Sequence, residues 1–233
     1  MMSDHDHGTE HAPTVAPGAS IAGARSRFSI VTALIWINVA VFAVAFVSED
    51  AYQRLCAWCA MQSLAVAQGQ LWRLVTAQYL HGSSWHLLVN VVALHFLGRP
   101  LEQRWSARKF FVIYTLCGLC GNMFYAILGT RDVIPLLQPA VGASGCIYGL
   151  LGIVAVLFPK AELYIYFLFP IRIRTAAVIL GVISFLTVIE RGGNYGGEAC
   201  HLAGLAFGVW WALHGDEWWS ATEWRLPWQQ PRE

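Results

Sequence analysis

The stretch "PAVGASGCIYGLLG" places one serine, Ser144, between two glycines at the head of an apolar run. A serine hydroxyl becomes a useful nucleophile only when a neighbouring base takes its proton, and neutral imidazole does this near neutral pH. In an apolar helix a serine more often bonds to its own backbone or packs against a neighbour. Ser144 is therefore a candidate nucleophile only if the fold brings a histidine to it.

A candidate histidine lies in the stretch "ACHLAGLAFG" near the C-terminus. On a helix, His201, Gly204 and Gly208 share one face, at i, i+3 and i+7. Two small residues four apart let helix backbones approach closely, and Gly145 begins a matching small surface beside the serine. If these faces meet, His201 is carried toward Ser144. Plain tight packing of two helices is the alternative interpretation, and the two are compatible.

Other groups near the serine can stabilise a developing oxyanion, which acyl transfer requires. The backbone amide of Ser144 is one candidate, since it is expected at a helix N-terminus with Gly142 shortly before it. His86 and Asn90, in "HGSSWHLLVN", lie four residues apart on one helix face and carry side-chain donors. Tyr148, four residues after the serine, is placed to support an imidazole ring.

A third member for a catalytic triad is harder to find. Glu198, three residues before His201, is the only acid close to that histidine in the sequence. We expect its carboxylate to face the outer solvent. The sequence therefore favours a Ser–His dyad over a triad, although triads are recognised by geometry.

The composition indicates a membrane protein. Hydrophobic residues make up 57% of the chain and charged residues 12%, against about 25% charged in soluble domains. The net charge of +1, without a basic block, argues against nucleic-acid binding. Six apolar segments predict an all-α, six-span bundle. They are roughly Phe28–Val47, Trp85–Leu97, Phe110–Leu128, Ser144–Phe158, Thr175–Ile189 and His201–Leu213.

The positive charges predict the orientation of this bundle. With the N-terminus inside, nine lysines and arginines near the segments are cytoplasmic and four are outside, which favours both termini inside. Even-numbered helices then begin at the outer face, so Ser144, His86, Asn90 and His201 share one level. Polar groups at membrane depth usually face one another or a water-filled cavity. The candidate residues should therefore converge near the outer surface.

The same pattern divides the chain into three parts. Residues 1–24 are polar and rich in Gly, Pro and Ala, and are expected to be a disordered cytoplasmic tail. Residues 25–214 form the six-helix membrane domain. Residues 215–233 form a Trp-rich cytoplasmic tail suited to the headgroup layer.

The cysteines allow a zinc site, which we do not favour. Two pairs have metal-ligand spacing, Cys56 with Cys59 in "CAWC" and Cys117 with Cys120 in "CGLC". The first pair is expected in an outer loop and the second within a span, so the four should not converge. The first pair can form a disulfide if that face is oxidising. We predict no metal and no cofactor.

Together these motifs resemble the rhomboid family of intramembrane serine proteases. The resemblance extends over roughly Gln70 to Gly208, and it depends on the order of the motifs because each is weak alone. The motifs are "LWR" (Leu71–Arg73), "HLLVN" with His86 and Asn90, "LEQRW" (Leu101–Trp105), "GASG" with Ser144, and "HLAGLAFG" with His201.

The resemblance implies a chemistry and a site. A Ser144–His201 dyad would cleave transmembrane substrates near their outer end, without metal or cofactor. His86, Asn90 and the Ser144 amide would receive the oxyanion, with Tyr148 in a supporting role. Substrates would be single-span proteins whose helix unwinds easily near the cut. Cys200 stands where family members often carry alanine, a small change.

The resemblance also implies structural roles and a location. The first outer loop, residues 48–84, would lie partly in the membrane, and the fifth helix would gate lateral access. Glu102 and Arg104 would be structural residues on the cytoplasmic side. We expect a multi-pass protein of a bacterial cytoplasmic membrane.

A rhomboid relative that binds membrane clients without cleaving them is the alternative function. Such relatives generally lose the serine or the histidine, and this chain has both, which favours the enzyme. The "CAWC" pair leaves open a specialised branch, such as the rhomboid-like enzymes that process C-terminal sorting tails.

Overall fold

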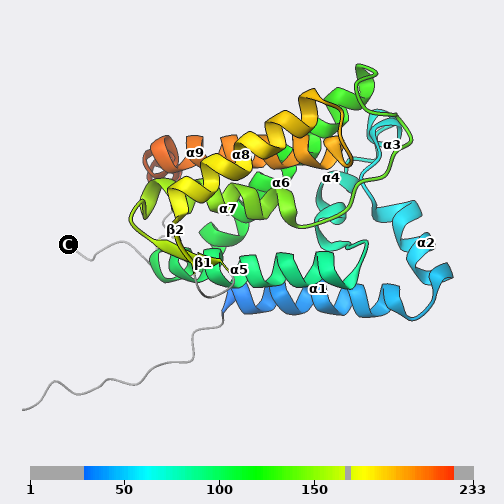
Figure 1. Cartoon of the computed structure of the whole chain (residues 1–233). Coiled ribbons are helices and arrows are strands. Elements are labelled where there is room, and N and C mark those ends of the chain that lie inside the picture. Colours follow the sequence, from blue (N-terminus) through cyan, green and yellow to red (C-terminus); the bar gives the residue numbers. More distant parts are fainter. Residues whose placement is uncertain (1–28, 166–168, 223–233) are drawn as a thin grey trace, which may run out of the picture.

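The computed structural model describes residues 29–165 and 169–222 of the chain. They form a mostly helical bundle with one small hairpin (Figure 1). In chain order the elements are α1 (Ile30–Phe46), α2 (Glu49–Cys59), α3 (Ser63–Ala67), α4 (Arg73–Thr76), η1 (Ala77–Tyr79), α5 (Ser84–Arg104), α6 (Ala107–Thr130), α7 (Ser144–Leu157), β1 (Glu162–Ile165), β2 (Phe169–Arg172), α8 (Ile173–Ile189) and α9 (Tyr195–Thr222).

Each of the six apolar segments corresponds to its own helix over the described residues, namely α1, α5, α6, α7, α8 and α9. Among the described residues α6 alone is both long and apolar enough to cross a membrane, and α1, α7 and α8 are shorter apolar helices. The number of spans and the side of the termini therefore stay predictions. The expected N-terminal tail lies outside the described residues. Helix α9 continues to Thr222, past the expected end of the domain at residue 214.

Helix α7 is the centre of the bundle and packs against α6 and α9. A side chain at Gly204 would overlap the Gly145 carbonyl oxygen, and one at Gly208 would overlap the Gly149 carbonyl oxygen. These glycines let the α7 and α9 backbones touch. The close approach predicted from their spacing is thus present.

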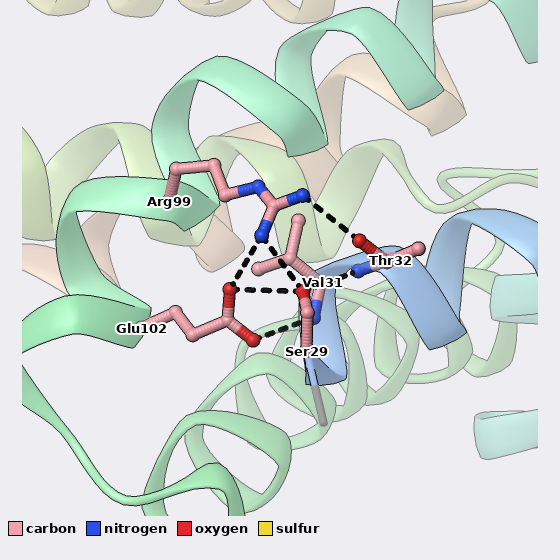
Figure 2. A network of polar contacts seen from close by, with 5 residues as sticks. All are labelled: Ser29, Val31, Thr32, Arg99 and Glu102. Carbon is pink, nitrogen blue, oxygen red and sulfur yellow. Dashed lines mark hydrogen bonds and ion pairs between the residues drawn. The ribbon is translucent and has the colours of Figure 1, made fainter. Parts of the chain in front are cut away.

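Helices α1 and α5 lie side by side and are joined at one end by a polar network (Figure 2). The Glu102 carboxylate accepts hydrogen bonds from Ser29 Oγ (3.0 Å) and from the backbone N–H of Val31 (3.2 Å). Arg99 donates to Ser29 Oγ, Thr32 Oγ1 and the same carboxylate. Glu102 therefore satisfies a first-turn amide of α1 that has no partner in its own helix.

Four short helices fill the connection between α1 and α5, where the sequence indicated only a long loop. Helix α2 ends in carbonyl groups that no longer have helical partners. The buried Arg73 donates to the carbonyls of Ala57 and Ala60, and Thr76 Oγ1 donates to the carbonyl of Cys59 (2.8 Å). These bonds fasten the end of α2 to α4.

The "CAWC" pair lies at the end of α2, and both thiols are free. Burial raises the pKa of Cys56, which favours the thiol over the thiolate that binds metals and exchanges disulfides. Within the described part of the chain no group of three or more metal-ligating side chains forms. The absence of a metal stays a prediction.

The hairpin of β1 and β2 was not predicted. It is antiparallel, with Glu162 opposite Arg172 and Tyr164 opposite Pro170. Pro170 lies in β2, and "RIR" (Arg172–Arg174) runs from the end of β2 into the first turn of α8, which begins at Ile173, two residues before the expected start of the fifth segment at Thr175.

Candidate active site

Ser144 is the first residue of α7, directly after its N-cap Ala143. The preceding Gly142 has φ +135°, a backbone conformation that other residues rarely adopt, and its N–H donates to the Ala77 carbonyl (2.9 Å). A side chain on Gly142 would also strike the His86 ring. Gly142 therefore turns the chain into α7 and leaves room for His86 beside the serine.

The packing of α7 on α9 brings the serine and the histidine into contact. Ser144 Oγ and His201 Nε2 are 2.8 Å apart, the length of a good hydrogen bond. The side chain of His201 is 12% exposed, so the pair is largely shielded from solvent. This is the geometry in which an imidazole can take the serine proton.

Tyr148 lies one turn after the serine and stacks on the His201 ring. The two ring centroids are 4.2 Å apart and the ring planes differ by 10°. Offset stacking of this kind restricts how the imidazole can tilt. Tyr148 thus lies where it can limit movement of the imidazole, and its supporting role stays a prediction.

His86 and Asn90 face the same cavity as the serine and the histidine. Its volume is about 530 Å³, and its lining includes His86, Asn90, Ser144, Tyr148 and His201. Asn90 Nδ2 donates one hydrogen bond to the His86 carbonyl in its own helix (2.7 Å), which leaves a second amide hydrogen. All five side chains predicted for the site thus converge on one hollow.

The position of Glu198 differs from the solvent-facing one that we expected. It does not face the solvent: its Oε2 lies 3.0 Å from His201 Nδ1, and the Ser184 hydroxyl donates to the same oxygen at 2.6 Å. The spacing of three residues on one helix already placed Glu198 and His201 on one face. The buried Ser184 comes from α8, and no signal in the sequence linked it to Glu198.

His81 is a further residue that the sequence reasoning missed. It is 2% exposed, and neither ring nitrogen makes a hydrogen bond within the described residues. Its ring lies edge-on to that of His86, with centroids 5.1 Å apart. Burial, as the larger cause, and the neighbouring His86 together lower the pKa of His81 to about 4. His81 is therefore neutral at neutral pH.

Comparison with known proteins identifies the family of this chain. The Rhomboid domain profile matches residues 68–215. "Rhomboid-like protease 3" of Toxoplasma gondii is 29% identical over 74% of this chain and 66% of its own length. "Putative rhomboid protease YdcA" of Bacillus subtilis is 37% identical, over 39% of this chain and 43% of its own. "Inactive RHOMBOID-like protein 8" of Arabidopsis thaliana is 29% identical, over 55% and 35%. The chain thus spans two thirds or less of the length of each relative. It belongs to the rhomboid family.

Proposed function

We propose that this rhomboid protein is an intramembrane serine endopeptidase that cleaves transmembrane substrates through an acyl-enzyme. The observation that carries the proposal is the 2.8 Å contact between Ser144 Oγ and His201 Nε2 in a cavity lined by both polar and apolar side chains. Peptide hydrolysis consumes water, so within a membrane it needs a hollow that water can enter and that shields polar groups from lipid.

The proposed reaction has two halves. His201 Nε2 takes the Ser144 proton as Oγ attacks the substrate carbonyl carbon, and the oxyanion forms near His86, Asn90 and the Ser144 amide. The imidazolium then protonates the departing amine as the peptide bond breaks. A water molecule, deprotonated by His201, attacks the acyl-serine, and the proton returns to Ser144 as the acid leaves.

The proposed substrates are single-span membrane proteins with a helix that unwinds readily near the outer face. A stable helix keeps its carbonyls in hydrogen bonds and hides the scissile bond. We further propose that both termini are cytoplasmic. We also propose that the protein lies in a bacterial cytoplasmic membrane. The relatives named above do not determine this location, because they come from a bacterium, a plant and Toxoplasma gondii.

The test compares wild type with Ser144→Ala and His201→Ala, purified in detergent and in liposomes. Cleavage of a generic transmembrane substrate and labelling by a fluorophosphonate are measured on each. We expect both signals in wild type and neither in Ser144→Ala. Cleavage retained by folded Ser144→Ala would overturn the proposal.

The same experiment addresses the client-binding alternative, and the inactive Arabidopsis relative is a precedent for a rhomboid protein without activity. Folded wild type that neither cleaves nor labels would favour that function. Labelling without cleavage would show an active nucleophile with the wrong substrate, and would direct the search to a specialised substrate class such as sorting tails.

A further inference from the structure

We infer that Glu198 is a positioning residue for His201 and that Ser184 of α8 holds it in place. This inference rests on the proposed protease function, and it extends the catalytic dyad of Ser144 and His201 by a third residue, Glu198. His201 Nε2 faces Ser144 Oγ at 2.8 Å, while Nδ1 faces Glu198 Oε2 at 3.0 Å. Both ring nitrogens are thus occupied by different partners.

The chemistry of the carboxylate selects one form of the imidazole. An ionised carboxylate can only accept hydrogen bonds, so its partner Nδ1 must carry the proton. The other nitrogen, Nε2, is then a free acceptor for the Ser144 hydroxyl, as a general base requires. The negative charge of Glu198 also stabilises the imidazolium that forms once His201 has taken the serine proton.

Ser184 gives Glu198 a fixed position. A serine within a helix commonly donates to a carbonyl of its own backbone, yet the fully buried Ser184 donates across to Glu198 at 2.6 Å. Hydrogen bonds from a hydroxyl to a carboxylate are short and strong. The Glu198 side chain is 20% exposed, so water competes only weakly for it. A carboxylate held by the Ser184 hydroxyl orients the His201 ring better than a mobile one.

A purely structural role would also place an acid here, because Glu198 lies in the first turn of α9, where a negative charge stabilises the helix. Glu198→Gln separates the two roles, since it keeps the shape and offers an amide that can donate to Nδ1 and favour the wrong tautomer. We expect fluorophosphonate labelling and kcat to fall about 100-fold, less than the ~10⁴-fold known for a fully buried triad acid. KM and the melting temperature should change little.

A second test variant and two matched controls come from α8 and the residue after it. As the first control, Glu190→Gln removes an exposed acid at the end of that helix and should leave the labelling rate and kcat unchanged. Ser184→Ala should lower kcat by about 3- to 10-fold, the loss of one hydrogen bond. Thr187→Ala removes a hydroxyl that bonds only within α8, to the Ile183 carbonyl, and should have no effect.

A second measurement does not depend on activity. In full-length protein with ¹⁵N-labelled histidine, the nitrogen shifts of His201 report which nitrogen carries the proton. We expect the Nδ1–H form in wild type and a shift toward Nε2–H in Glu198→Gln. If Glu198→Gln does not fold, the positioning role is tested by the tautomer of His201 in wild type and by the labelling rate and kcat of Ser184→Ala.

The outcomes distinguish the two proposals. Active wild type with unchanged rates in Glu198→Gln overturns the inference and leaves the protease assignment standing. Wild type that neither labels nor cleaves overturns the protease function itself. An Nε2–H tautomer in resting wild type overturns the positioning role whatever the activity.

Discussion

The distance between Ser144 and His201 is set by glycines rather than by the two side chains themselves. Gly204 lies against the Gly145 carbonyl with no space for a methyl group. The two glycines are not equivalent, however. A side chain at Gly145 would make only ordinary contacts, at 3.7 Å from the Gly118 Cα and 3.9 Å from the Cys200 oxygen. Gly204 alone of this pair therefore controls the approach of the helices.

This asymmetry predicts that Gly204→Ala is far more harmful than Gly145→Ala. The added methyl group of Gly204→Ala must push α7 from α9, at a cost of about 1–3 kcal/mol in the free energy of unfolding. Fluorophosphonate labelling should fall at least tenfold. Gly145→Ala should keep labelling within about twofold and serves as the matched control, together with Gly193→Ala at an open position. Equal losses in Gly204→Ala and Gly145→Ala would contradict this account.

The sequence predicted the residues that share a helix face and the approach of α7 to α9, but it missed the partner that α8 contributes. Helical spacing placed Tyr148 beside the serine and Gly204 beside the histidine. The same spacing placed Glu198 beside His201, but the inward orientation of that acid depends on Ser184 of α8. Nothing in the α8 sequence distinguishes Ser184 from the nearby Thr187, because packing between helices decides which hydroxyl is buried.

At the scale of elements, long apolar segments were predictable and short polar ones were not. Six runs of hydrophobic residues marked six helices, since each run must be shielded from water. The helices α2 to η1 are held mainly by Arg73 and other contacts distant in sequence, which no local pattern encodes. The hairpin of β1 and β2 is four residues per strand, too short for alternation to identify.

The contact between α1 and α5 predicts that Glu102→Ala destabilises the fold. The change leaves the Val31 amide and Arg99 without their shared acceptor, which should lower the free energy of unfolding by about 1–3 kcal/mol. Thermal unfolding in detergent measures it. Asp50→Ala is the control, because its ion pair with Arg54 is 73% and 79% exposed and is worth about 0–1 kcal/mol. A melting temperature as high as that of wild type in Glu102→Ala would show that the network is dispensable.

At the scale of the whole molecule, His81 makes stability depend on pH. The pKa of His81 is about 4 in the fold and 6.5 without it. Between these values the unfolded chain binds the extra proton, so stability falls as the pH is lowered from 6.5 to 4. The full effect is on the order of 3 kcal/mol.

His81→Phe should therefore flatten the acid side of the stability profile. The aromatic ring fills the same space and has no nitrogens to leave without hydrogen bonds. Melting temperatures at pH values spanning this window should fall less in His81→Phe than in wild type, with the exposed His95→Gln as control. An equal fall in melting temperature in wild type and His81→Phe would show that groups other than His81 cause the acid sensitivity.

Helix α8 combines an apolar outer face with one buried hydroxyl. Val178, Ile179, Val182, Ile183 and Phe185 are each 45–61% exposed, whereas Ser184 is fully buried and holds Glu198. In a bilayer the exposed side chains contact acyl chains, whose length and order bear on the tilt of the helix. If the proposed protease function and the inferred contacts of Glu198 both hold, we expect membrane thickness to affect the alignment of His201, so that turnover differs between thin and thick lipids.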